Sequence, residues 1–142
     1  NGRLDTLQAA VLLAKLEIFA EEIELRQQVA ETYSTLLAVA ASPVVPPRIA
    51  DNYVSAWAQY SVLANDEGSR KALRNRLEKA GVPTAVYYPK PLHLQPAFNY
   101  LGYAQGDFPV SEDFARRIFS LPMHPYLQRR QQEAIAEVLF GR

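Results

Sequence analysis

The hydrophobic pattern at the start of the chain predicts one long helix over residues 6–37. Asp5 and Gln8 have the spacing of a capping box at its entry. The first turns are apolar on every face, with Leu7, Val11, Leu12, Leu13, Ala14, Leu16, Ile18 and Phe19. A helix that is apolar all round has to be covered on all sides. We therefore expect these turns to be enclosed by protein outside this chain, as part of a larger oligomeric protein.

Beyond Glu21 the helix becomes amphipathic, because Leu25, Val29, Tyr33 and the leucines at 36 and 37 share one face. Prolines then mark a loop over 42–53, and the stretch 90–109 has too little periodicity to assign. The expected elements are a strand over 55–64, a helix over 70–80 capped by Asn65 or Asp66, a strand over 83–88, a short helix from 111, a brief strand over 119–121 and a helix over 128–140.

This order of elements predicts an α+β fold, in which a long N-terminal helix precedes a small, mostly antiparallel sheet covered by helices. We divide the chain into an interface helix over residues 1–40, leading out of a large domain that this chain lacks, and a small α+β domain over 41–142.

Composition narrows the function classes. Basic and acidic residues balance at 15 each, so no overall field favours nucleic acid or a lipid surface. The absence of cysteine excludes disulfides and thiol catalysis. Lys15 and Glu17 interrupt the apolar run over 9–20, which is neither a membrane span nor a signal peptide. We expect a cytoplasmic protein that binds neither nucleic acid nor membrane.

The first candidate for chemistry is the segment Asn1-Gly2-Arg3, directly before the capped helix. A helix N-terminus favours anions, and an arginine can hold a carboxylate or phosphate with two parallel hydrogen bonds. The alternative is a turn with a solvated arginine. The apolar character of the following helix favours the functional interpretation, because it places this loop at an interface.

The second candidate is the segment 87–93, Tyr-Tyr-Pro-Lys-Pro-Leu-His, at the end of an expected strand. Rigid backbone beside prolines holds phenol and imidazole groups in place, as a pocket for a polar ligand requires. The alternative is a packing corner of aromatic rings and prolines. His124, between two prolines, is expected to fill such a corner.

No set of residues in the sequence has the pattern of a complete catalytic centre. We find no nucleophile–base pair, metal-ligand spacing or glycine-rich phosphate loop. The lysines are Lys15, Lys71, Lys79 and Lys90, and only Lys90 lies outside an expected helix. The chain therefore has the character of part of an active site without the group that performs the reaction.

Four segments in order resemble the DegT-type nucleotide-sugar aminotransferases. They are N-G-R-L-D-T-L-Q-A-A-V-L-L-A-K-L (1–16), T-A-V-Y-Y-P-K-P-L-H-L-Q-P-A-F (84–98), G-D-F-P-V-S-E (106–112) and S-L-P-M-H-P (120–125). The likeness covers nearly the whole chain. It is strongest to the branch that aminates 3-oxo sugars, including uronic acids, attached to UDP.

The resemblance implies a fold-type-I pyridoxal-phosphate (PLP) enzyme that works as a homodimer with active sites at the subunit boundary. The Schiff-base lysine of that family lies upstream of the motif with which this chain begins. Asn1 then corresponds to a residue that reaches the cofactor phosphate of the neighbouring subunit, and Arg3 to one that holds an anionic group of the substrate. Tyr87 and Tyr88 correspond to a pair facing the sugar nucleotide, with His93 close by. Many relatives have histidine at the position of Tyr87, so an acid–base role there does not carry over.

The function implied is transfer of an amino group, from glutamate, to a nucleotide-linked keto-sugar in the synthesis of polysaccharide or lipopolysaccharide precursors. Two alternatives stay open from the residues alone. One is a PLP-dependent sugar dehydratase of the same family, in which another residue replaces the Schiff-base lysine. The other is a non-catalytic module for dimerisation or ligand sensing.

Overall fold

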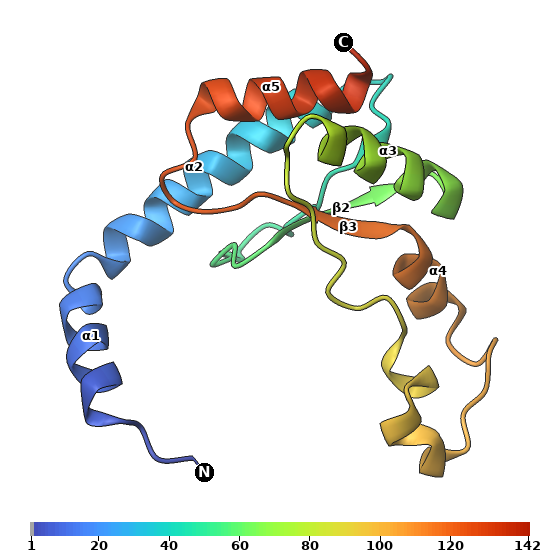
Figure 1. Ribbon diagram of the computed structural model, residues 1–142, viewed down its shortest axis with the longest axis horizontal. Coiled ribbons are helices and arrows are strands. Elements are labelled where there is room, and N and C mark those ends of the chain that lie inside the picture. Colours follow the sequence, from blue (N-terminus) through green and yellow to red (C-terminus); the bar gives the residue numbers. More distant parts are fainter. Residues whose placement is uncertain (1) are drawn as a thin grey trace.

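The computed structural model describes residues 2–142 and has the α+β fold predicted from the sequence (Figure 1). A three-stranded antiparallel sheet of order β1-β2-β3 forms its centre. Helices α2, α3 and α5 lie on one side of it, while α1 and a segment of 3-10 helices extend away in two separate directions (Figure 1). The elements are α1 (Thr6–Leu16), α2 (Phe19–Leu37), β1 (Val44–Val45), β2 (Tyr60–Ala64), α3 (Glu67–Lys79), η1 (Leu92–Leu94), η2 (Pro96–Leu101), α4 (Pro109–Arg117), β3 (Ile118–Leu121) and α5 (Arg129–Phe140).

The core lies between the sheet and these three helices. Tyr60, Val62 and Ala64 alternate along β2 and are fully buried, which confirms the face predicted for them. Tyr33 of α2 packs on Tyr60 with ring centroids 5.0 Å apart. The other fully or nearly fully buried apolar side chains include Leu37, Val44, Leu77, Phe119, Leu121, Ile135 and Leu139.

The single long helix predicted for residues 6–37 is wrong, because the chain turns between α1 and α2. At the turn, the Ile18 amide donates to the Lys15 carbonyl at 3.3 Å, and Ile18 leaves the helical region with φ −106° and ψ 1°. The Asp5 half of the expected capping box forms, since its carboxylate accepts from the amides of Leu7 and Gln8. The bend changes the direction of the chain, so α1 projects from the body (Figure 1).

Both predicted long strands are shorter in the structure. The strand predicted over 55–64 begins only at Tyr60, because Trp57 has a positive φ of 47° that an extended strand does not allow. The strand predicted over 83–88 is reduced to one bridge between Ala85 and Ser120. Conversely, β1 pairs with β2 inside the stretch expected to be loop, with Val44 opposite Ala64.

The helices of the second half are close to their predictions. Asp66 caps α3, which begins at Glu67, and Gly81 follows it in the left-handed conformation. Helix α4 begins at Pro109, two residues before the predicted start, because proline fits the first helical position. Helix α5 begins after Gln128, whose capping box with Gln131 fixes the entry.

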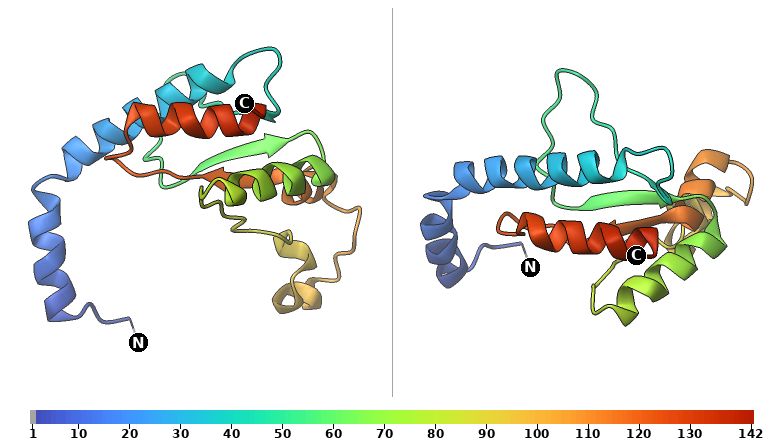
Figure 2. Two further views of the ribbon diagram at one scale, coloured as in Figure 1. Left: turned by 45° about the horizontal axis from the view of Figure 1, so that its top comes forward. Right: turned by 90° about the horizontal axis from the view of Figure 1, so that it is seen from above.

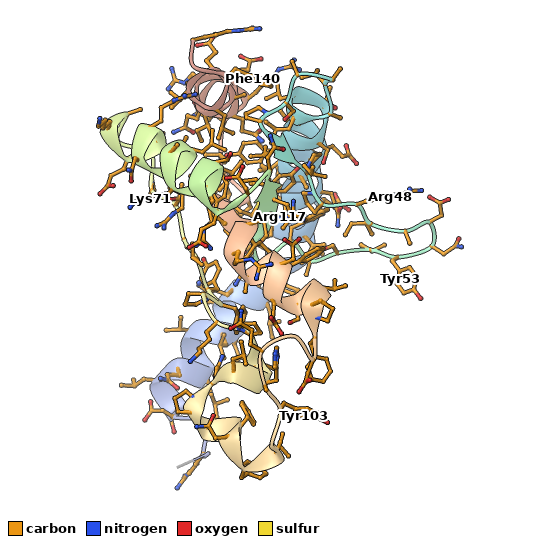
Figure 3. The ribbon with its side chains drawn as sticks, turned by 90° about the vertical axis from the view of Figure 1, so that its right-hand side faces the viewer. Arg48, Tyr53, Lys71, Tyr103, Arg117 and Phe140 are labelled. Carbon is orange, nitrogen blue, oxygen red and sulfur yellow. The ribbon has the colours of Figure 1, made fainter. Side chains whose placement is uncertain are left out.

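A loop over residues 46–57 projects from the body beside α2 (Figure 2). Arg48 and Tyr53 lie along this projection (Figure 3), and the Tyr53 side chain is 75% exposed. The base of the loop is tied to α2, where the Arg26 guanidinium donates to the Trp57 carbonyl at 2.9 Å. Within residues 2–142 no helix combines the length and hydropathy that crossing a membrane requires.

Candidate functional site

The candidate site is the loop over residues 86–92, which carries two of the side chains singled out in the sequence. Tyr87 and Tyr88 are 54% and 64% exposed, and the loop around them is neither helix nor strand up to Leu92. Their hydroxyls are therefore free to meet a ligand. What distinguishes this loop from an ordinary surface loop is that it is held at both ends.

The first attachment lies just before the tyrosines. Ala85 and Ser120 exchange two backbone hydrogen bonds, of 3.2 Å from the Ala85 amide and 2.8 Å from the Ser120 amide. The Ser120 hydroxyl lies 2.8 Å from that of Ser61 on the neighbouring strand β2. Because Ser120 belongs to β3, the beginning of the loop is tied to the central sheet.

The second attachment is a buried polar pair that follows the loop. His93 is 8% and Glu112 6% exposed, and His93 Nε2 lies 3.1 Å from Glu112 Oε1. The same carboxylate oxygen accepts a 2.8 Å hydrogen bond from the Gly106 amide. The imidazole packs on the Phe108 ring with centroids 4.8 Å apart. This hydrogen-bonded pair joins η1 to α4 across the segment over residues 95–108.

The charge state of Glu112 follows from these contacts. The Gly106 amide, and to a lesser extent the His93 imidazole, hold the pKa of the Glu112 carboxyl below its ordinary value against the opposing effect of burial. An ionised carboxylate only accepts hydrogen bonds, so His93 donates through Nε2. The Nε2 atom of His93 is thus used within the protein and is not available to a ligand.

Helix α4, which carries Glu112, is itself fixed to the body. Arg117 donates to the Asp113 carboxylate at 2.8 Å and to the Ala64 carbonyl at the end of β2 at 3.1 Å. The Arg70 guanidinium of α3 donates to the Ala115 carbonyl at 2.8 Å. Figure 3 shows Arg117 between the helices and the sheet. Glu112 therefore connects the loop to a rigid part of the molecule.

The two tyrosines line different hollows. Tyr87 borders one of about 220 Å³, together with Gln59 and Thr84. Tyr88 borders another of about 370 Å³, together with Lys90 and Ser111. The adjacent tyrosines therefore do not form a single pocket within this chain, although each stands beside further polar groups.

The two ends of the predicted site are not brought together in this chain. Asn1 lies outside the described residues, and Arg3 is exposed. Helix α1, which follows Arg3, and the η1–η2 segment lie on separate projections from the body (Figures 1 and 2). His124 is exposed, so the prediction that it fills a corner is wrong.

Glu112 and Gly106 were not among the site residues predicted from the sequence. Both lie within the segment 106–112 that carries the family resemblance, as His93 lies within the segment 84–98. Their place in the segments that resemble the family was the only sign in the sequence that these residues matter. Nothing in the spacing indicated that the two segments meet. Among residues 2–142, no cluster of three or more histidine, aspartate or glutamate side chains is suited to hold a metal ion.

The comparisons with known proteins identify the class. Residues 1–140 match the DegT/DnrJ/EryC1/StrS aminotransferase family, and the chain belongs to this family. It is 45% identical over 139 residues to UDP-2-acetamido-2-deoxy-3-oxo-D-glucuronate aminotransferase of Pseudomonas aeruginosa, covering 98% of this chain and 36% of that protein.

Solved structures agree with this membership. A DegT/DnrJ/EryC1/StrS aminotransferase from Brucella abortus has a TM-score of 0.87 at 45% identity, and DesV from S. venezuelae, determined with a ketimine intermediate, has 0.89 at 32%. Each match covers 98% of this chain and 36% of the other. The PLP form of Spr1654 from Streptococcus pneumoniae shares the fold, with a TM-score of 0.86 at 22% identity. The chain spans about 36% of the length of these relatives.

Proposed function

We propose that this chain is the C-terminal small domain of a PLP-dependent aminotransferase that moves an amino group from glutamate to a nucleotide-linked keto-sugar. A UDP-linked 3-oxo sugar, in particular a uronate, is the proposed acceptor. The 45% identity to the Pseudomonas aeruginosa enzyme, whose name specifies such a substrate, is the observation that carries this choice.

The proposed architecture follows the division made from the sequence. Residues 1–40 lead out of a large domain and contribute to a homodimer interface, and residues 41–142 form the small domain. The exposure of α1 supports this, because none of its residues is buried and Leu7 and Leu13 are 79% and 67% exposed. An apolar helix left open to water is unfavourable, so covering it stabilises the assembled protein.

Each site residue has a proposed role. Asn1 donates to the cofactor phosphate across the dimer, and Arg3 binds the carboxylate of a uronate substrate. Tyr87 and Tyr88 contact the sugar nucleotide, with His93 close by. The exposed phenols on a loop attached at both ends support this role, since a held loop loses less entropy when it binds.

The described lysines do not fit attachment of the cofactor. Lys15, Lys71, Lys79 and Lys90 are all exposed, whereas the imine needs a site that excludes water. We therefore place the Schiff-base lysine on protein outside this chain. When bound there, PLP supplies the chemistry of amino-group exchange. The residues of this chain bind and orient the substrate.

The test uses the full-length protein that contains this chain. It is incubated with PLP, glutamate and UDP-2-acetamido-2-deoxy-3-oxo-D-glucuronate, and products are identified by mass spectrometry. The proposal expects an aminated UDP-sugar together with 2-oxoglutarate. Loss of water from the sugar without amino transfer would indicate a dehydratase of the family instead. Absence of any conversion with this and related keto-sugars would indicate a non-catalytic module.

A further inference from the structure

The loop over residues 86–92 has no regular secondary structure before Leu92, the first residue of η1, and its tyrosines bind a ligand more tightly if the loop is ordered beforehand. Ordering a residue costs about 1–2 kcal/mol of conformational entropy when it occurs on binding. The bridge between Ala85 and Ser120 fixes one end of the loop to β3. The contacts of Glu112 are what fix the other end, at His93.

One oxygen atom makes this second attachment. Glu112 Oε1 accepts from His93 Nε2 at 3.1 Å and from the Gly106 amide at 2.8 Å. The two donors lie in segments that no strand pairing joins, and the carboxylate and imidazole are both more than nine-tenths buried. Removing the carboxylate leaves two donors without their acceptor, in an environment where an unpaired polar group is costly.

We propose that Glu112 is a positioning residue for substrate binding, which holds His93 and thereby fixes the 86–92 loop that carries Tyr87 and Tyr88. This inference rests on the proposed function, because it assigns the loop to the nucleotide-sugar. Glu112 itself is buried, and its Oε1 atom is used by His93 and Gly106. Its effect reaches the site through the imidazole and the backbone that follows Lys90.

Other residues of the segment 95–108 support a role for Glu112 in holding the loop rather than in chemistry. Phe108 packs on both His93 and Tyr103, with centroids 4.8 and 5.0 Å away. Tyr103 lies on the outer part of this segment (Figure 3) and is 48% exposed. Gly106 has a φ of 100°, which places its amide at the carboxylate in a conformation that L side chains rarely adopt. These features converge on Glu112.

Three substitutions in the full-length enzyme separate positioning from other roles. Glu112→Ala removes both acceptor contacts. Glu112→Gln keeps an acceptor oxygen at the same length, and Glu112→Asp keeps the charge but shortens the side chain. Glu133→Ala is the matched control, since it removes a helical carboxylate whose ion pair with Arg129 is exposed.

The readouts are steady-state kinetics with UDP-2-acetamido-2-deoxy-3-oxo-D-glucuronate and hydrogen–deuterium exchange of peptides covering residues 86–92. We expect Glu112→Ala to raise KM about tenfold or more with kcat changed about twofold or less, as loss of uniform binding predicts. Exchange across the loop should accelerate in parallel. Glu112→Gln should restore both readouts, and Glu133→Ala should match the wild type. Where Glu112→Ala does not fold, Glu112→Asp provides the same test with an intermediate effect.

Unchanged KM and unchanged loop exchange in both Glu112→Ala and Glu112→Asp would overturn the inference. Equal losses of kcat in the alanine and glutamine variants would also overturn it, because they would indicate a direct chemical role for the charge. If the wild type shows no amino transfer, the proposed function fails, and loop exchange alone then decides whether Glu112 fixes the loop.

Discussion

The indole Nε1 of Trp57 donates a 2.8 Å hydrogen bond to the side-chain oxygen of Gln27, so the base of the projecting loop is locked to α2. The amide nitrogen of the same Gln27 side chain donates to the Ser55 carbonyl. One glutamine therefore holds both sides of a turn in which Trp57 adopts a φ of 47°. The contacts of this glutamine compensate for a backbone conformation that is unfavourable for tryptophan.

Gln27→Ala is expected to destabilise the 142-residue chain. It leaves the indole N–H of the buried Trp57 and the Ser55 carbonyl without their partners, which costs about 1–3 kcal/mol. Urea unfolding followed by tryptophan fluorescence measures the change. Gln28→Ala, at the next position of α2, is the matched control and should change the unfolding free energy by about 0.5 kcal/mol or less. Equal effects of the two substitutions would contradict this role for Gln27.

Asp66 is expected to stabilise the fold in a pH-dependent way. The Ser69 amide, followed by its hydroxyl, donates to the Asp66 carboxylate and holds its pKa below the ordinary value. Because the pKa is lower in the folded state, the stabilisation is complete above the unfolded pKa and is lost as pH falls through the folded pKa. Asp66→Ala should therefore lower the unfolding temperature at neutral pH, with a difference from wild type that shrinks in acid. A difference that stays constant through acid pH would contradict this explanation.

Helix α1 gives a prediction about assembly. Leu13→Asp should leave the stability of the 142-residue chain nearly unchanged, because the side chain is 67% exposed there. In the full-length protein the same change buries a charge and should weaken the dimer or lower its unfolding temperature. Light scattering and calorimetry on both proteins measure this contrast. Glu31→Ala, at an exposed position of α2, is the control. If Leu13→Asp changed neither the dimer nor the unfolding temperature of the full-length protein, the proposal that α1 is enclosed would be contradicted.

Arg3 gives a prediction about the substrate. In the full-length enzyme, Arg3→Ala should raise KM for a UDP-linked uronate by about 10- to 100-fold, since a charge-assisted contact contributes about 1.5–3 kcal/mol. Arg130→Ala, on the exposed side of α5, should have no such effect. The same assay with a keto-sugar that lacks the carboxylate should show little dependence on Arg3. If kinetics with the uronate do not change, Arg3 is a solvated side chain.

Local signals predicted much of the fold. The caps at Asp5 and Asp66 and the alternation along β2 are short-range patterns, and they have the same role in the structure. The bend at Ile18 had no such signal, because neither glycine nor proline stands there and the apolar pattern continues through it. The chain over 83–88 has the composition of a strand but pairs only at Ala85, since pairing depends on the partner strand rather than on composition.

The candidate site was predictable in part. The exposed tyrosines at 87 and 88 were found from their proline-rich context and from the family resemblance. The hydrogen bond between His93 and Glu112 joins residues 19 positions apart, and the sequence between them has no clear periodicity. Only the three-dimensional structure shows that the imidazole faces a carboxylate. The place of His93 beside the substrate stays a prediction, and the structure adds its hydrogen bond to Glu112.

The most direct test of the central claim is the dissociation constant of the full-length protein for the aminated UDP-sugar, measured by calorimetry for the wild type, Tyr88→Ala and Tyr53→Ala. The two tyrosines are 64% and 75% exposed, so the variants are matched in burial but lie on different loops. We predict about tenfold or greater weakening for Tyr88→Ala, as expected for loss of about 1.4 kcal/mol or more, and no change for Tyr53→Ala. Equal affinities of all three proteins would contradict the assignment of the 86–92 loop to the nucleotide-sugar.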